Sequence, residues 1–422
     1  MGYWFEDPTL KALAPLALST SIKGLSTIFN TPKIYVGANV FPEGPVIGPS
    51  TMDALGPRCA KKRAFVVTDE FNQRYVKKIV QFLESGGFTT EVWAETLPEA
   101  PMENVLACAE AVNAFEPDLI MALGGGSVMD LSKGAWLLYE RPDLKDLGMI
   151  SPLDTLNLRN KAILAAVPTT SGTGSECTGA AVFHDTAAHR KIPVAHDELV
   201  PDVAILLPEF TLSMPPNLTA GTGLDVLAHA MDAVTAPSAN EFTQPLALKA
   251  VEMVFNWLPR AFRNGDDREA RHRMMIASNI AGIAFGMSGC HLTHSFGHAL
   301  GAVYEMHHGL CVGFFIPHSF QFCKSVTDAH LAICKTLDIP APNAEAGMEN
   351  LVTRVREFLT ELDVPLTLKG FGIEQADFEA KLPKLVEYSY GDISCYLSPR
   401  PITAEQCEKV MRYAYDGKDI DF

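Results

Sequence analysis

Short β-rich segments alternate with helical segments across the first half of the chain, from about Lys33 to Leu207. This order of elements is typical of a parallel sheet with helices packed on its faces. Strands are expected at residues 33–36, 64–68, 90–93, 118–123 and 162–167. Apolar residues recur at helical spacing between residues 76 and 83, and Gly86-Gly87 follows as a stop signal. The first half of the sequence therefore predicts an α/β domain.

The second half of the chain shows a different pattern. After about Pro208 the strand signals fade, and amphipathic helical stretches occupy residues 246–258, 273–285, 351–362 and 404–413. A chain of 422 residues exceeds the usual size of one compact core. No internal repeat or low-complexity linker marks a boundary, so the change of pattern alone divides the chain. It predicts an α/β domain of residues 1–206 and a helical domain of residues 207–422.

The bulk composition limits the partners that the chain can have. Its 34 basic and 50 acidic residues give a formal net charge of -16, which disfavours nucleic acid and anionic membranes as partners. Nine cysteines without a C-x-x-C pair argue against a disulfide framework and favour a reducing compartment. Residues 1–19 lack the basic region and apolar core of a signal peptide, and no apolar run approaches the roughly 20 residues of a membrane span. We therefore expect a cytoplasmic protein with a small-molecule ligand.

A glycine-rich loop follows the strand expected at 118–123. It consists of Gly124, Gly125, Gly126 and Ser127, and a helix with Asp130 in its first turns comes next. A strand, a glycine turn and a helix start aim backbone N–H groups at a phosphate, because glycine allows close approach and the helix N-terminus favours negative charge. The spacing differs from the G-x-G-x-x-G dinucleotide fingerprint. We interpret the loop as a pyrophosphate-binding loop, with a simple tight turn as the alternative.

A second polar loop follows the strand expected at 162–167. Residues 168–176 contain two glycines and five hydroxyl side chains, among them Thr169, Thr170, Ser171 and Thr173. These side chains supply many hydrogen-bonding groups around a backbone that can bend sharply. Loops at the ends of neighbouring strands face one crevice, so both loops are expected to bind a dinucleotide cofactor. Two polar turns that cap helices are the alternative.

The strand expected at 64–68 is followed by Asp69. A carboxylate at this place accepts a hydrogen bond from a ribose 2′-hydroxyl and repels a 2′-phosphate. We therefore expect NAD as the cofactor in preference to NADP. The alternatives are that the neighbouring Glu70 makes this contact and that Asp69 is an ordinary turn residue.

A carboxylate and several histidines of the second half form a candidate metal site. Asp225 and His229 lie four residues apart in a helical segment, so both side chains are expected on one face, where they can bind one ion. Five of the twelve histidines follow, namely His291, His294, His298, His307 and His308. One carboxylate and three imidazoles suit Fe(II), Zn(II) or Mn(II) and leave an open position for an alcohol oxygen. A surface histidine or a hydrogen-bonded buried histidine remains the alternative for His294 and His308.

Taken together, these motifs resemble the iron-containing, or group III, alcohol dehydrogenase family over nearly the whole chain. The resemblance rests on Ala122-Leu-Gly-Gly-Gly-Ser127 with Asp130, on residues 168–176, on Gly223-Leu-Asp-Val-Leu-Ala-His229, on H-x-x-x-H-x-x-G from His294 to Gly301, on His308-Gly309 and on Ser398-Pro-Arg400. It implies a dehydroquinate synthase-like fold, in which an α/β nucleotide-binding domain precedes an all-α metal-binding domain.

The same resemblance implies the ligands and a catalytic residue. The family's one Asp and three His ligands correspond to Asp225, His229, His294 and His308, with Fe(II) as the expected metal. His298 corresponds to the family's histidine near the metal, which is proposed to relay protons. The implied reaction is NAD-dependent and metal-dependent transfer of hydride between a primary alcohol, or its aldehyde, and nicotinamide. A homodimer or larger homo-oligomer is expected.

Three positions depart from the family's pattern. Leu207 stands where the family commonly has Asp, His291 where it usually has a small or apolar residue, and His307 where Pro is common. Because His291 and His307 lie close in sequence to the expected ligands, they can alter the pocket. We therefore infer no substrate from any relative of the family.

Three alternatives to an alcohol dehydrogenase are open. They are a glycerol-type polyol dehydrogenase, a dehydroquinate synthase-like lyase and a relative that only binds nucleotide. The lyase needs several cations for its phosphorylated, carboxylated substrate, but basic residues between 225 and 309 are few, namely Lys249, Arg260, Arg263, Arg268, Arg271 and Arg273. This scarcity disfavours the lyase, and the presence of all four expected ligands disfavours the non-catalytic relative.

Overall fold

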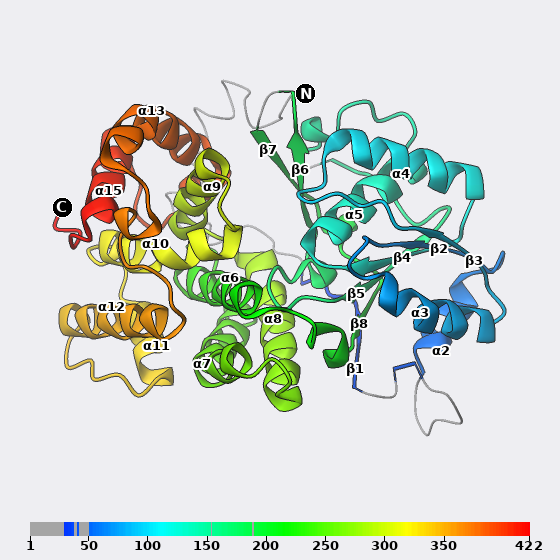
Figure 1. The fold of residues 1–422 in the computed structure, drawn as a ribbon, viewed down its shortest axis with the longest axis horizontal. Coiled ribbons are helices and arrows are strands. Elements are labelled where there is room, and N and C mark those ends of the chain that lie inside the picture. The colour runs from blue at the N-terminus through cyan, green and yellow to red at the C-terminus, as the bar shows by residue number, and fades with distance from the viewer. Residues whose placement is uncertain (1–28, 38–39, 42–49, 153, 188–189) are drawn as a thin grey trace. The chain divides into compact units, whose positions relative to one another are not determined.

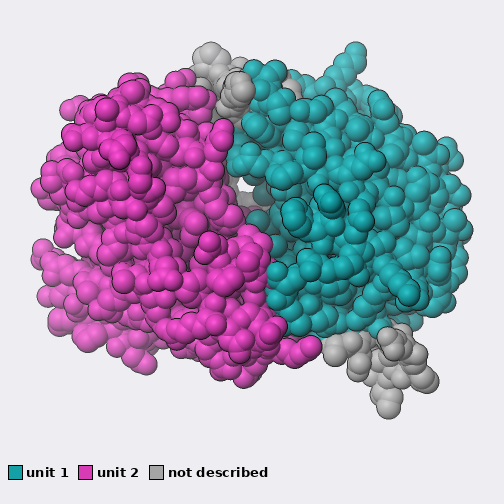
Figure 2. All heavy atoms as spheres, in the orientation of Figure 1, with its two compact units in different colours: residues 1–7, 28–213 teal, residues 8–27, 214–422 magenta. Residues whose placement is uncertain are grey.

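The computed structural model describes residues 29–37, 40–41, 50–152, 154–187 and 190–422. The described residues form two compact units, and the boundary between the units lies between Ser213 and Met214. Figure 2 shows the two units in different colours. The domain boundary expected from the sequence, after residue 206, lies a few residues before the boundary between these units. The stretch 1–19, in which the sequence shows no signal peptide, lies outside the described residues.

The described part of the first unit is built on a six-stranded parallel sheet with the order β1-β8-β5-β4-β2-β3 (Figure 1). The strands are β1 (Lys33–Val36), β2 (Arg63–Val67), β3 (Thr89–Trp93), β4 (Leu119–Gly124), β5 (Ile163–Pro168) and β8 (Val203–Leu206). All five strands expected from the sequence are present, each end within one residue of its expected position.

Helices cover both faces of this sheet. They are α2 (Thr51–Leu55), α3 (Gln73–Ser85), α4 (Met102–Phe115) and α5 (Gly126–Glu140). Successive side chains of a strand point to opposite faces. Phe65 of β2 accordingly packs in one apolar cluster with residues of α4 and α5, and Ala64 packs in another with residues of α2 and α3. Every residue of β4 is buried, as in a central parallel strand, so the predicted α/β architecture is confirmed.

Smaller elements complete the described structure. Short 3₁₀ segments lie at Gly56–Arg58, Leu147–Met149, Ser175–Cys177, Asp197–Leu199, Pro208–Thr211 and Lys369–Phe371. The sequence pattern does not predict the antiparallel pair of β6 (Ala180–Asp185) and β7 (Arg190–Ala195). Pro193 within β7 lacks an N–H and argues against a strand, but a two-stranded sheet tolerates proline because one edge of each strand needs no partner.

The second unit contains only helices among its described regular elements. They are α6 (Pro216–Thr235), α7 (Thr243–Arg263), α8 (Arg268–Ser288), α9 (Leu292–Tyr304), α10 (His308–Cys323), α11 (His330–Thr336), α12 (Ala344–Glu361), α13 (Gln375–Gly391), α14 (Ile393–Tyr396) and α15 (Ala404–Asp416). Every residue of α6 from Thr219 onward is buried. The predicted helical second domain is confirmed, and α6 is its central element.

No single helix in the described part of the chain is long and apolar enough to cross a membrane. The pair α8 and α9, which bends by 106° at its break, meets the length and composition criteria jointly. All nine cysteines lie among the described residues, where each is buried and none forms a disulfide.

Candidate functional site

The two polar loops of the first unit begin at adjacent strands. β4 and β5 pair in parallel with Gly124 opposite Pro168, and the N–H of Thr169 donates to the carbonyl oxygen of Gly124 at 3.0 Å. Both loops therefore leave the carboxyl edge of the sheet side by side, as expected from their positions after two successive strands of the sequence. α5 begins at Gly126, so the first loop presents a helix N-terminus, which is suited to a phosphate.

Glycine is needed where the two loops meet. An added Cβ at Gly126 would lie 2.8 Å from Cγ2 of Thr173, and one at Gly125 would lie 3.2 Å from Cγ2 of Thr170. A side chain at Gly126 would therefore displace Thr173, and one at Gly125 would require a small shift of Thr170. Ser171 is buried in the second loop, and its Oγ has no hydrogen-bond partner among the described residues. A buried hydroxyl without a partner is costly, and a hydrogen bond from a ligand in this loop would remove the cost.

Ser127 and Asp130 are engaged by neighbouring segments. The N–H of Glu99 donates to Oγ of Ser127 at 3.0 Å. The hydroxyl of Ser175 donates to Oδ1 of Asp130 at 2.9 Å, and the N–H of Val182 donates to Oδ2 at 2.9 Å. Asp130 therefore ties α5 to the second loop and to β6, and so shapes that loop.

Lys133 belongs to this site, although the sequence reading did not single it out. Its side chain is almost fully buried, and Nζ donates to Oγ of Ser175 at 2.8 Å and to the carbonyl oxygens of Thr178 at 2.8 Å and Ala180 at 2.6 Å. Burial lowers the pKa of Lys133 to about 8. The signal for this residue is its spacing of three from Asp130, which places both side chains on one face of α5.

Asp69 follows β2 at the same carboxyl edge of the sheet. The hydroxyl of Thr68 donates to the carbonyl oxygen of Leu123 at 2.8 Å and joins the ends of β2 and β4. Oδ1 of Asp69 accepts hydrogen bonds from the backbone and side-chain nitrogens of Asn72 at 2.9 and 2.8 Å. The carboxylate is partly exposed and keeps further acceptor capacity, because an ionised carboxylate has about four lone-pair sites.

Three histidines of the second unit converge on one carboxylate oxygen. The Nε2 atoms of His308, His229 and His294 lie 3.2, 3.6 and 3.9 Å from Oδ1 of Asp225. α6 supplies Asp225 and His229 one turn apart, α9 supplies His294, and α10 begins at His308. The structure thus brings together the four residues that the sequence resemblance implies as ligands.

Close packing of α10 on α6 sets the position of His308. An added Cβ at Gly309 would lie 2.0 Å from the carbonyl oxygen of Gly221 and 3.1 Å from Cβ of Asp225. Only a residue without a side chain permits this approach. The two helices therefore meet at their backbones directly beside the cluster.

The cluster has the properties of a cation site. Asp225, His229 and His294 are buried, whereas the side chain of His308 is 31% exposed and leaves one side accessible. Oδ1 of Asp225 and Nε2 of His294 make no hydrogen bond within the described residues. Buried polar atoms without partners are costly, and a divalent cation among them would remove this cost. The residues therefore fit a metal ion.

The pKa values of Asp225, His229 and His308 also suit a cation. Burial lowers the pKa of His229 to about 3, and it lowers the pKa of His308 as well. Burial alone would raise the pKa of Asp225, but His229 and His308 outweigh it and hold this pKa well below its usual range. At neutral pH Asp225 is therefore charged and His229 neutral, which are the forms that ligate metals. Burial would lower the pKa of His294, but Cys290 and Asp232 raise it above its ordinary value, so a cation that binds there must displace a proton from this ring.

Asp232 is a buried carboxylate behind the cluster that the sequence reading did not single out. Its Oδ2 lies 3.0 Å from Nδ1 of His294 and also accepts a hydrogen bond from the hydroxyl of Thr293. A hydrogen bond at Nδ1 leaves Nε2 of His294 as the atom that faces Asp225. The spacing of seven residues between Asp225 and Asp232 places both on one face of α6 and is the signal for this residue.

His291 supports Asp232. Its N–H donates to Oδ2 of Asp232 at 2.9 Å, and its Nε2 lies 3.2 Å from Oδ1 of Asp232 and 2.7 Å from Oγ1 of Thr235. The ring is almost fully buried. His291, which departs from the family's pattern, therefore holds in place the carboxylate of Asp232 that orients His294.

His298 lies beside the cluster, one turn after His294 on α9. Its ring stacks on His308 with centroids 5.1 Å apart, and its Nδ1 lies 2.7 Å from Oδ2 of Asp392. Asp392 also caps α14, since the N–H of Ser394 donates to its Oδ1 at 2.7 Å. The groups of described donor atoms close enough to hold one ion do not include His298.

The remaining positions singled out in the sequence have structural surroundings. His307 is exposed at the start of α10, where an added Cβ at Gly221 would lie 2.6 Å from its Nδ1. Leu207 is fully buried in the apolar core of the first unit. Nη1 of Arg400 donates to the carbonyl oxygens of Phe322 at 2.7 Å and Phe422 at 2.8 Å, so the Ser-Pro-Arg motif anchors the C-terminal residue.

Known proteins resemble the chain in sequence and in fold. The chain is 32% identical over 378 residues to the NADPH-dependent butanol dehydrogenase of Clostridium saccharobutylicum, which covers 89% of this chain and 97% of that protein. It is 28% identical over 383 residues to the NAD-dependent methanol dehydrogenase of Bacillus methanolicus, with 88% and 98% covered. The iron-containing alcohol dehydrogenase structure from Thermococcus thioreducens matches with a TM-score of 0.80 at 27% identity and covers 92% of this chain and 99% of that one.

Two family models together match most of the chain. Residues 42–208 match the model for iron-containing alcohol dehydrogenase, and residues 219–415 match the model for the C-terminal part of the Fe-containing alcohol dehydrogenase family. The second match spans the four clustered residues Asp225, His229, His294 and His308. The family resemblance of the sequence motifs is confirmed, and the chain belongs to the iron-containing alcohol dehydrogenase family.

Proposed function

We propose that the chain oxidises small primary alcohols and reduces the corresponding aldehydes with NAD, using one divalent cation held by Asp225, His229, His294 and His308. As a member of its family, the chain is an oxidoreductase that acts on alcohols and aldehydes. The approach of three Nε2 atoms to Oδ1 of Asp225, at 3.2, 3.6 and 3.9 Å, carries the proposal.

The donor set supports a particular kind of ion. One carboxylate oxygen and three imidazole nitrogens suit Fe(II), Zn(II) or Mn(II), and the family's name supports Fe(II). When bound, such an ion supplies a Lewis acid that lowers the pKa of an alcohol hydroxyl and polarises an aldehyde carbonyl. The exposed side of His308 gives a substrate oxygen access from solvent.

His298 is proposed to carry the proton of the alcohol to solvent. Its side chain is 27% exposed and stacks on His308. With Nδ1 hydrogen-bonded to Asp392, Nε2 is the nitrogen that accepts the proton in alcohol oxidation and returns it in aldehyde reduction. Asp392 keeps the ring in this orientation through this hydrogen bond.

The first unit is proposed to bind the cofactor. The backbone of Gly124, Gly125, Gly126 and Ser127 holds the pyrophosphate, and the hydroxyl loop with Thr169, Thr170, Ser171 and Thr173 surrounds the nucleotide. Asp130 and Lys133 hold that hydroxyl loop through Ser175. The two relatives named above use different cofactors, NADPH and NAD, so the preference for NAD rests on the carboxylate of Asp69.

The size of the substrate is proposed from the relatives, whose names specify butanol and methanol. The basic residues of the second unit do not favour the lyase alternative. Arg260, Arg263 and Arg273 pair with carboxylates of Asp267, Glu361 and Glu269, and Nη2 of the buried Arg271 donates to the carbonyl oxygen of Met214. These cations are engaged in structural contacts, and none of them supports recognition of a phosphorylated substrate.

The proposal is tested by a substrate screen with metal-loaded protein, in which NADH absorbance is followed in both directions. Short primary alcohols and their aldehydes should turn over, and diols and polar aldehydes serve as comparison substrates. Asp69→Asn should reduce the ratio of kcat/KM for NAD to that for NADP, while Glu70→Gln, at the neighbouring exposed position, should leave the ratio unchanged. A native preference for NADP would contradict the role of Asp69.

A further inference from the structure

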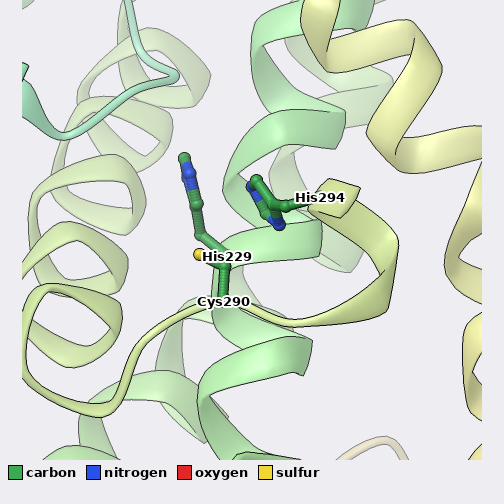
Figure 3. A group of neighbouring side chains, drawn as sticks. All are labelled: His229, Cys290 and His294. Atoms are coloured by element: carbon green, nitrogen blue, oxygen red, sulfur yellow. The ribbon is translucent and has the colours of Figure 1, made fainter. Parts of the chain in front are cut away.

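Cys290 lies among the proposed ligands and has no part in the function proposed above. Two groups of described residues place three donor atoms within 4.8 Å of one another, and they share His294. One group is Asp225, His294 and His308, and the other is His229, Cys290 and His294. Figure 3 shows the second group, with His229 on α6, His294 on α9 and Cys290 on the segment between α8 and α9. A thiol thus stands beside two imidazoles of the proposed centre.

The backbone on both sides of Cys290 is held in place. Gly289 ends α8 with φ of +77°, and its N–H donates to the carbonyl oxygen of Phe285 at 2.6 Å. The N–H of His291 donates to Asp232 at 2.9 Å. Cys290 itself is buried. Its thiol therefore occupies a position that the surrounding structure fixes.

One imidazole beside this thiol has an unused nitrogen. Nε2 of His294 is buried and has no hydrogen-bond partner among the described residues. Nδ1 of His294 is already held by Asp232, so Nε2 is the nitrogen of that ring that remains for an ion. Buried lone pairs on nitrogen beside a sulfur are the arrangement that binds Zn(II) and other ions with an affinity for thiolate.

We propose that Sγ of Cys290 is a further ligand of the divalent cation, so that the centre combines oxygen, nitrogen and sulfur donors. This inference rests on the proposed function, which supplies the ion. The Sγ–H bond breaks as the Sγ–metal bond forms, and the proton passes to water without any change of oxidation state. A thiolate favours Zn(II) and disfavours Mn(II), which prefers oxygen ligands. The other four ligands suit Fe(II), Zn(II) or Mn(II), and a thiolate from Cys290 therefore makes Mn(II) the least suitable of the three.

Cobalt(II) is the probe that reports the sulfur directly. The metal-free full-length protein is loaded with Co(II), metal content is measured, and the near-ultraviolet spectrum is recorded. A thiolate ligand gives a sulfur-to-cobalt charge-transfer band, which we expect in the native protein and not in Cys290→Ser or Cys290→Ala. The matched control is Cys334→Ala, because Cys334 is also buried in the second unit but its thiol donates to the carbonyl oxygen of Gly347. The control should keep the band.

Metal selectivity gives a second, independent reading. Chelator competition should show that Cys290→Ala loses Zn(II) affinity by at least about 10-fold, the lower end of the cost of disturbing a ligand's surroundings. The Mn(II) affinity of Cys290→Ala should change less, so the ratio of its Zn(II) affinity to its Mn(II) affinity should fall. The same ratio should not fall in Cys334→Ala. X-ray absorption of the native zinc form should include sulfur at about 2.3 Å.

The possible failures are distinguishable. Native protein that binds Co(II) without a charge-transfer band, or a band that persists in Cys290→Ala, overturns the role of Cys290 and leaves the four-ligand centre intact. Protein that binds neither Co(II) nor Zn(II) overturns the metal centre itself and this inference with it. The native cobalt spectrum decides the matter even if both Cys290 variants fail to fold.

Discussion

The Nδ1 atom of His298 lies 2.7 Å from Oδ2 of Asp392, while the same imidazole ring stacks on His308. His298 is therefore held by a carboxylate on one side and adjoins the proposed metal centre on the other. Because it lies outside the donor groups, we expect His298→Ala to retain the metal. Loss of a general acid or base should lower kcat by roughly 10²- to 10⁴-fold.

Metal content, kcat and KM of this one variant separate the possible roles. His272→Ala is a suitable control, because His272 is a partly exposed histidine of α8 outside the cluster, and it should keep native turnover. Loss of metal from His298→Ala would make His298 a ligand. An unchanged kcat with an unchanged pH profile would end the proton-carrier proposal.

Asp392→Asn separates the charge of Asp392 from its position. Asparagine still accepts the N–H of His298 and is a good helix cap for α14, so the fold and KM should be retained. The protonated imidazole loses its charged partner, and the bond weakens by about 1 kcal/mol, which corresponds to a fall in kcat of several-fold to roughly 10-fold. Asp392→Ala should cost more turnover and also lower the thermal midpoint. Native kcat in the Asn variant would show that orientation alone matters.

Gly309→Ala should separate α10 from α6. The added methyl would stand 2.0 Å from the carbonyl oxygen of Gly221, so the helices must move apart and carry His308 away from Asp225. Overpacking of this kind costs about 1–3 kcal/mol, and metal affinity should fall with stability. Gly391→Ala is the matched control, because an added Cβ there meets nothing within 4 Å. Denaturant unfolding and metal analysis of both variants give the answer, and native metal affinity in Gly309→Ala would refute the packing argument.

His318 should make stability depend on pH. It is buried in α10, and burial together with the charge of Arg356 lowers its pKa to about 4. The backbone of Phe314 and the carboxylate of Asp419 offset only part of this lowering. Between pH 6.5 and pH 4 the unfolded chain binds a proton that the folded chain does not, so stability falls as the pH falls. The full effect is about 3 kcal/mol.

His318→Leu removes this dependence, and the free energy of unfolding measured from pH 7 to pH 4 should fall less steeply than in the native protein. His272→Gln changes a partly exposed histidine of α8 and should keep the native slope. Equal slopes in His318→Leu and the native protein would mean that His318 is protonated in the folded state.

The parts of the fold that the sequence predicts correctly are those set by local pattern. The strands around Phe65 and Ile120 are apolar runs bounded by polar turns, and such runs define buried parallel strands without knowledge of the rest of the chain. Asp225 and His229 are one helical turn apart, so a single helix brings them together. The sequence analysis did not predict the β6–β7 pair. Pro193 within β7 has no N–H to donate and is tolerated because a two-stranded sheet leaves one edge of each strand without a required partner.

The supporting residues of the site depend on contacts between distant segments. Asp232 acts on His294 across 62 positions, and Asp392 acts on His298 across 94. A buried carboxylate is costly unless it is paired, but the sequence shows neither that these two are buried nor which group pairs with them. The sequence likewise does not show that Cys290 lies beside His229, because the bend between α8 and α9 brings the two residues together.

The central claim is that turnover depends on a cation held by Asp225, His229, His294 and His308. The direct measurement is to strip the protein with a chelator, add back Fe(II) or Zn(II) in steps, and record bound metal and NADH-linked alcohol oxidation on the same samples. We predict that metal-free protein is inactive, that activity rises in proportion to bound metal up to a single ion per chain, and that His308→Ala neither binds the ion tightly nor recovers. Full turnover by protein shown to be metal-free would contradict the account.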